Sequence, residues 1–172
     1  KMRYDEDHGR FGFTSDYLTS GYSLKKLVHP DSEGDAYNKI VPYPWPIIRL
    51  SELYLNYAEA LNEANGPSQQ VYDALNMVRD RAGIPTIEEA WSDATIAANA
   101  GKHTNPEGLR EIIQQDRMIE LAFEGHRYND LRRWKIAEHY LSTPLRGWSV
   151  NESSEANFYS IRDIGIRSFS TP

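Results

Sequence analysis

The chain has 172 residues, a length typical of one domain and long enough to bury a hydrophobic core. Its 25 acidic residues outnumber its 19 Lys and Arg, so the formal net charge is −6. That balance argues against general nucleic-acid binding and against a basic membrane-surface patch, because both need clustered positive charge. Cysteine is absent, which excludes disulfides, Cys-ligated metals and a Cys nucleophile within these residues.

The first part of the chain, residues 1–45, shows no helical period. Charges, glycines and aromatic residues alternate there, and three prolines follow at positions 42, 44 and 46. Each proline disfavours helix at the residue before it, so the chain is expected to run extended towards the first helix. We predict irregular structure over residues 1–45.

Two helices are predicted next, over Pro46–Ala64 and Ser68–Ala82. Both segments carry apolar residues at the 3.6-residue period. The sequence Asn65-Gly66-Pro67 ends the first helix, because glycine accepts the left-handed cap and proline cannot continue the helix. A turn this short predicts antiparallel packing, so the two helices should form an αα-hairpin.

Further helices are predicted downstream, with a short Ala-rich one within Ile87–Ala100. The sequence Asn105-Pro106-Glu107 is typical of a helix start, and the apolar period continues to Glu124. A fourth helix is expected over Tyr128–Tyr140. The tail, residues 142–172, should be irregular, with one short strand near Asn157–Ile161.

The predicted fold class is therefore mostly α, with tetratricopeptide-like helical hairpins and irregular loop segments at both ends. We expect a single domain over 1–172, with a helical core at 46–141. Tetratricopeptide repeats are helical hairpins of about 34 residues, and such arrays need at least about three units. One hairpin therefore predicts tetratricopeptide-like packing, not a solenoid.

Charged residues are concentrated between residues 116 and 134. Asp116, Glu120 and Glu124 are spaced at i, i+4 and i+8, which predicts one shared helix face. Neighbouring arginines can hold such carboxylates through bidentate hydrogen bonds. We predict a structural ion-pair network formed by Asp116, Arg117, Glu120, Glu124, Arg127, Asp130, Arg132 and Arg133. The alternative interpretation is a glycosidase-type carboxylate pair, Glu120 and Glu124.

No cofactor and no metal ion are expected. Glu124, His126 and Asp130 lie near one another in the sequence, but zinc sites usually use two or three histidines at helical spacing. No Gly-rich phosphate loop and no Gly-x-Ser-x-Gly nucleophile motif is present.

Three tryptophans lie in or near predicted loops: Trp45, Trp91 and Trp148. An exposed indole ring can stack on a sugar ring, whereas a buried one packs in a core. These three are the candidate ligand-binding residues, and both interpretations stay open for each.

Three segments resemble the SusD/RagB family. They are residues 45–63 (WPIIRLSELYLNYAEALNE), residues 74–85 (ALNMVRDRAGIP) and residues 109–134, which contain ELAFEGHRYNDLRRW. Their order and spacing are similar to the family's helical region. The resemblance covers roughly residues 42–136.

The resemblance implies a non-enzymatic, surface-exposed outer-membrane lipoprotein that captures an oligo- or polysaccharide and delivers it to a SusC-like TonB-dependent transporter. Family members are several hundred residues long and carry a lipidated cysteine, so we expect this chain to be a C-terminal region, with the anchor in the full-length parent. Two alternatives are a helical-repeat scaffold that binds proteins without a small ligand, and a glycoside hydrolase that uses Glu120 and Glu124.

Overall fold

The structure is a computed structural model that describes residues 20–22, 24–33 and 39–165. Parts of the predicted irregular segments, residues 1–19, 23, 34–38 and 166–172, lie outside the described residues. The chain divides into two compact units. One comprises residues 44–127, and the other comprises residues 1–43 and 128–172. The prediction of a single domain stays a prediction.

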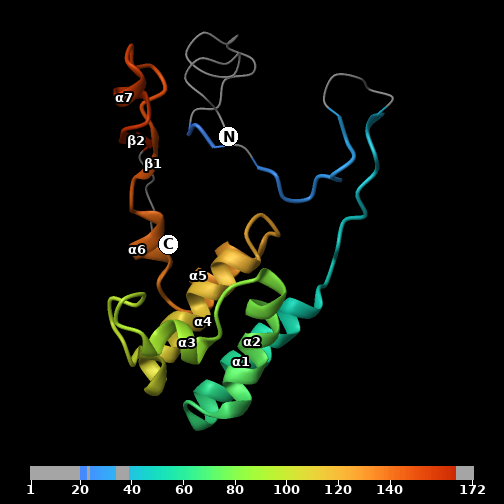
Figure 1. Cartoon of the computed structure of the whole chain (residues 1–172), viewed down its shortest axis with the longest axis vertical. Helices are drawn as coiled ribbons and strands as arrows, with labels where there is room; N and C mark the ends of the chain where they lie inside the picture. Colours follow the sequence, from blue (N-terminus) through green and yellow to red (C-terminus); the bar gives the residue numbers. More distant parts are fainter. Residues whose placement is uncertain (1–19, 23, 34–38, 166–172) are drawn as a thin grey trace. The chain divides into compact units, whose positions relative to one another are not determined.

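The first two helices of the unit 44–127 form the predicted hairpin. Helix α1 spans Leu50–Asn65 and α2 spans Gln69–Ala82, and they pack side by side (Figure 1). Gly66 ends α1 at φ 77°, and its N–H donates to the carbonyl oxygen of Asn62. Gly83 ends α2 in the left-handed conformation that glycine adopts without steric cost.

The remaining elements of this unit complete its core. Helix α3 spans Ile87–Ser92, a 3-10 turn η2 spans Lys102–Thr104, and α4 spans Pro106–Glu120 and packs on α1. The side chain of Asn105 caps α4 by accepting a hydrogen bond from the N–H of Gly108, as the Asn-Pro-Glu sequence predicts. The buried apolar core consists of Leu55, Ala58, Val71, Ala74, Leu75, Val78, Ile87, Leu109, Ile112, Ile113 and Leu121.

Three of the predicted helices differ in extent from the apolar period. Helix α1 begins at Leu50, four residues after the predicted start at Pro46. Helix α4 ends at Glu120, four residues before the predicted end, and Phe123 and Gly125 then take positive φ values of 65° and 84°. The predicted helix over 128–140 is two helices, α5 at His126–Arg133 and α6 at Ala137–Leu141. Lys135 separates them at φ 59°.

Helix α5 ends just before Lys135 without a glycine. The N–H of Lys135 donates to the carbonyl oxygen of Arg132, and the N–H of Ile136 donates to the carbonyl oxygen of Leu131. This is the hydrogen-bond pattern of a Schellman motif, in which glycine usually takes the left-handed position. No turn residue in the sequence marked this ending.

The other unit contains a small β-sheet, so the prediction of an irregular tail is wrong within residues 145–165. Strand β1 (Leu145–Trp148) pairs antiparallel with β2 (Ile161–Gly165), and α7 (Glu155–Phe158) lies between them in the sequence. A strand was predicted at residues 157–161, and the observed strand β2 begins at Ile161, the last residue of that range. Trp148, Val150 and Phe158 form a separate buried cluster here.

The mostly helical fold class is confirmed, with tetratricopeptide-like packing in the α1–α2 hairpin. The elements that depart from it are the two short strands. Among the described residues, no helix combines the length and the apolar character needed to cross a membrane.

Gly108 provides a test of the packing between η2 and α4. A Cβ atom at this position would lie 2.1 Å from the backbone carbonyl oxygen of Lys102. Alanine normally favours a helix over glycine by about 1 kcal/mol, but this clash is with backbone that cannot rotate away. We expect Gly108→Ala to lower the free energy of unfolding by about 1–3 kcal/mol, measured by urea denaturation. Glu107→Ala, at an exposed neighbouring position, is the control; a Gly108→Ala variant as stable as this control would contradict the prediction.

Candidate functional site

Arg49, the residue before α1, connects the start of that helix to the end of α4. Its guanidinium donates two hydrogen bonds to the carboxylate of Glu124, at 2.8 and 2.7 Å, and one to Glu120 Oε1 at 2.8 Å. It also donates to Ser51 Oγ and to the backbone carbonyl of Glu120, both at 3.0 Å. The hydrogen bonds with Glu124 and Glu120 outweigh desolvation and raise the pKa of Arg49 above its usual range.

Two arginines of α2 also bind carboxylates of α4. Arg79 is buried and bonds both carboxylate oxygens of Asp116, at 3.0 and 2.7 Å, while its Nε donates to the carbonyl of Pro85. Arg81 donates to Glu120 Oε2 at 2.5 Å. Burial raises the pKa of Asp116 above its ordinary value, although Arg79 opposes the shift.

The structure adds partners that were not predicted. Arg49 and two arginines of α2, which precede the charged segment in the sequence, bind the carboxylates of Asp116, Glu120 and Glu124. The shared helix face is wrong for Glu124, because α4 ends at Glu120.

The predicted arginines have contacts of their own. Arg117 is buried and donates to Asn56 Oδ1 at 2.6 Å, with Glu52 at 4.0 Å. Arg133 pairs with the buried carboxylate of Asp130 at 2.9 Å, as the sequence predicts for neighbours at i and i+3. Arg132 lies over the ring of Tyr128, and both Arg127 and Arg132 belong to α5.

Sequence reasoning missed Arg49, Arg79 and Arg81. A signal for Arg79 was available, since it adjoins Val78 on the buried stripe of α2, where an arginine needs a carboxylate partner. Arg49 carried no such signal. Within the part of the chain that the structure describes, no group of three His, Asp or Glu residues is placed to hold a metal ion.

The three candidate tryptophans have different surroundings. Trp45 is 63% exposed, in the extended segment before α1. Trp91 is half-buried against the core, with the Lys102 ammonium 5.5 Å from its ring centroid. Trp148 is buried, with the ring centroid of Tyr22 at 4.8 Å and that of Tyr159 at 5.0 Å. Trp45 is thus the one of the three whose ring is largely open to a ligand.

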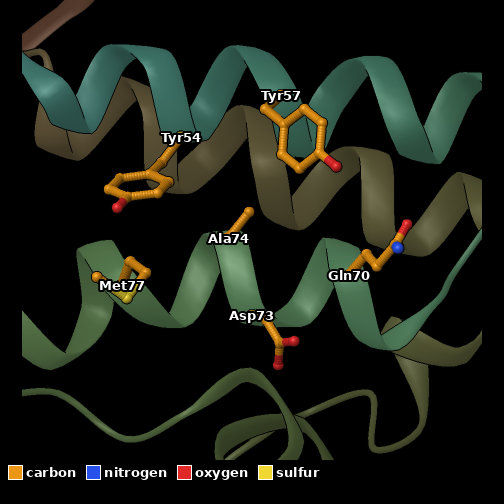
Figure 2. Close-up of a pocket in the computed structure, with 6 residues that line it drawn as sticks. All are labelled: Tyr54, Tyr57, Gln70, Asp73, Ala74 and Met77. Carbon is orange, nitrogen blue, oxygen red and sulfur yellow. The ribbon is translucent and has the colours of Figure 1, made fainter.

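A groove of about 360 Å³ lies between α1 and α2. Figure 2 shows Tyr54 and Tyr57 extending from α1 and Ala74 and Met77 on α2, with Asp73 directed away from α1. Gln70 completes the lining of this groove, which the ring faces and the thioether make mainly apolar.

Comparison with known proteins gives one family. The family model described as the SusD family matches residues 6–171. The chain belongs to the SusD family. The resemblance in the helical segments is thereby confirmed, and the match extends beyond them at both ends.

Individual SusD-like proteins align with it over different lengths. SusD-like protein P25 of Formosa agariphila is 39% identical over 52% of this chain and 15% of its own length. A crystal structure of a SusD-like protein from Bacteroides fragilis is similar at 31% identity and a TM-score of 0.69, over 90% of this chain and 27% of that one. A SusD-like carbohydrate binding protein of the same organism covers 100% of this chain and 34% of its own, at 28% identity and a TM-score of 0.70. The chain thus spans about a third or less of these relatives.

Removing Arg49 should destabilise this SusD-family helical unit strongly. Arg49→Ala removes the Arg49 guanidinium from Glu120 and Glu124, whose side chains are only 12% and 7% exposed. Breaking a buried ion pair by removing one partner lowers the free energy of unfolding by about 3–5 kcal/mol. We expect a loss near the lower end of this range, because the pair is partly exposed and Arg81 still binds Glu120. Urea denaturation followed by circular dichroism measures it.

The control for Arg49 is Arg110, which also holds a carboxylate with two hydrogen bonds, at 2.6 and 2.7 Å to Glu63. Both side chains of that pair are about 40% exposed, at 39% and 43%. Exposed pairs contribute about 0–1 kcal/mol, so Arg110→Ala should change stability little. Equal losses in the two variants would contradict the assignment.

The pH dependence of stability should have opposite signs at Asp116 and Glu63. Burial raises the pKa of Asp116, and hydrogen bonding to Arg110 lowers that of Glu63. A raised folded-state pKa contributes stability below the unfolded value, and the contribution is lost as pH rises through the folded value. A lowered pKa contributes stability above the unfolded value, and this is lost as pH falls.

Urea denaturation between about pH 3 and 7 tests these signs. As pH rises, wild type should lose stability relative to Asp116→Asn and gain stability relative to Glu63→Gln. The same sign of change against both variants would show that one of the two shifts is assigned wrongly.

Proposed function

We propose that this chain is the helical part of a SusD-family protein that captures carbohydrate without cleaving it. The observation that carries the proposal is the likeness to the solved SusD-like carbohydrate binding protein, which extends over the whole of this chain. Membership of the family supports it further. The substrate class is an oligo- or polysaccharide.

The same proposal includes a cellular setting. The parent protein would be anchored by lipid to the outer membrane, face the outside of the cell and pass its ligand to a SusC-like TonB-dependent transporter. The support for this setting is family membership alone. The described residues would supply the framework that holds the binding surface in place.

Capture without cleavage fits the arrangement of the acidic residues. The two carboxylates considered for hydrolysis, Glu120 and Glu124, are both hydrogen-bonded to the guanidinium of Arg49. A glycosidase needs one carboxylic acid that donates a proton to the leaving group. Arginine hydrogen-bonds carboxylates in their ionised, acceptor form, so this geometry favours a structural role for both.

Trp45 is the residue through which we expect this chain to contact sugar. Its indole is largely exposed, and an exposed aromatic face can stack on the apolar face of a sugar ring. The proposal assigns no contact to Trp148, which lies in the cluster of the other unit.

Affinity gel electrophoresis of the full-length protein tests the function. Gels containing an α-glucan, a β-glucan, a xylan or an acidic polysaccharide should reveal at least one that retards the protein. For that polysaccharide, Trp45→Ala should weaken binding about tenfold, as loss of an aromatic contact worth about 1.4 kcal/mol would, without changing thermal unfolding.

The comparison variant is Trp148→Ala, which should lower the unfolding temperature because it empties a buried site. Retardation by none of the polysaccharides would refute the proposed function. Unchanged binding by Trp45→Ala would remove this residue from the binding surface.

A further inference from the structure

The turn between α1 and α2 contains the sole asparagine-glycine pair of the sequence. Asn65 is the last residue of α1, and Gly66 follows it at φ 77° and ψ −170°. In such a pair the backbone nitrogen of the glycine can attack the side-chain amide of the asparagine, because glycine has no Cβ to hinder the approach. The pair is therefore a place where the chain can modify itself without an enzyme.

The modification has two steps, and its co-reactants are water and a base. The Gly66 nitrogen loses its proton to the base and forms a bond with Cγ of Asn65. The bond from Cγ to the side-chain nitrogen breaks, and that nitrogen takes a proton from water and leaves as ammonia. A succinimide ring remains. Water then opens the ring at either of its two carbonyls, so the residue becomes aspartate or isoaspartate.

The structure restrains the nitrogen that must attack. The N–H of Gly66 donates a hydrogen bond of 2.9 Å to the backbone carbonyl oxygen of Asn62, and we call this bond the α1 cap. The cap must break before the nitrogen can lose its proton. Asn65 itself belongs to the helix, where Cα–Cβ bonds tilt towards the helix N-terminus and so away from the following nitrogen. Ring closure therefore needs the end of α1 to open.

A second hydrogen bond holds the same turn of helix against α4. The side chain of Asn62 is buried, at 1% exposure, and its Nδ2 donates to the carbonyl oxygen of Pro106 at 3.0 Å. Gly66 lies beside the same residue, since a Cβ atom built on it would be 3.5 Å from Pro106 Cγ. All of these residues belong to the unit 44–127. The end of α1 is thus fixed at the point where the reaction would occur.

We propose that Asn65 is a self-modification site, and that opening of the α1 cap limits its conversion to aspartate or isoaspartate. The product carries a carboxylate at the carbonyl end of α1, where a negative charge is unfavourable. The isoaspartyl form also adds a carbon to the backbone of the turn that joins α1 to α2. The modification therefore loosens the hairpin, and it accumulates in molecules whose cap opens. Neither the site nor its chemistry involves the proposed carbohydrate ligand.

Peptide mass spectrometry of the full-length protein tests the proposal. The protein is incubated in mildly alkaline buffer with and without guanidinium chloride, and the peptide that contains Asn65 is followed for the mass change from amide to acid. An isoaspartate-specific methyltransferase identifies the isoaspartyl product. We expect conversion at least about tenfold slower in the native protein, because only the open state reacts. Asn99, which precedes Ala100, is the internal control and should convert slowly in both states.

Two variants test whether the cap controls the rate. Asn62→Ala removes the hydrogen bond to Pro106 beside the site, whereas Val78→Ala removes similar bulk from the same core towards the other end of α2. Native conversion at Asn65 should become about tenfold faster in Asn62→Ala, the effect of losing one hydrogen bond. It should change little in Val78→Ala. Thermal unfolding verifies that both variants are folded under the conditions of incubation.

Three results would overturn the proposal. Equal rates in native and denatured wild type would show that the cap gives no protection. Equal acceleration by the two variants would show that global unfolding, and not the end of α1, controls the reaction. Absence of conversion at Asn65 in guanidinium chloride would remove the site itself. The wild-type comparison needs no variant, so it decides the question even if Asn62→Ala does not fold.

Discussion

The placement of α4 against α1 depends on the guanidinium of Arg49. Apolar contacts hold these two helices together, but hydrophobic attraction has no direction and tolerates sliding. The paired hydrogen bonds to Glu124 and the bonds to the carboxylate and carbonyl of Glu120 do have direction. Desolvation offsets much of what such a part-buried ion pair gains, so we interpret its role as fixing the position of the helix end. Arg79 of α2 pairs with Asp116, one turn earlier on α4, and so fixes α4 against α2 as well.

Helix ends were predictable where the sequence carries a chemical signal. Two helices end at the predicted glycines, Gly66 and Gly83, because glycine adopts backbone conformations that other residues avoid. Helix α4 begins at the predicted Asn105-Pro106 pair, because asparagine caps a helix and proline fits its first turn. The endings at Glu120 and Lys135 have no such residue, and apolar spacing continues past both. Tertiary packing sets these boundaries, and periodicity alone extends the helices too far.

Candidate side chains were harder to predict than elements. Glu124 and Asp116 bind arginines that lie 75 and 37 positions away in the sequence. Nothing in a local pattern joins residues at such separations. The tryptophans illustrate the same limit: Trp45 and Trp148 both fall outside predicted helices, and only the packing of Tyr22 and Phe158 on Trp148 distinguishes a core ring from an exposed one.

The ion-paired Arg49 and the proposed ligand-binding residue Trp45 both lie in the short segment before α1. Trp45 lies four residues before Arg49, and Pro46 between them restricts the backbone. Because Arg49 is fixed to Glu120 and Glu124, the end of this segment nearest the helix cannot move freely. An aromatic ring that stacks on a sugar binds better when its backbone is already ordered, since less conformational entropy is lost on binding. The ion pairs that hold α4 in place therefore also limit the motion available to the proposed binding residue.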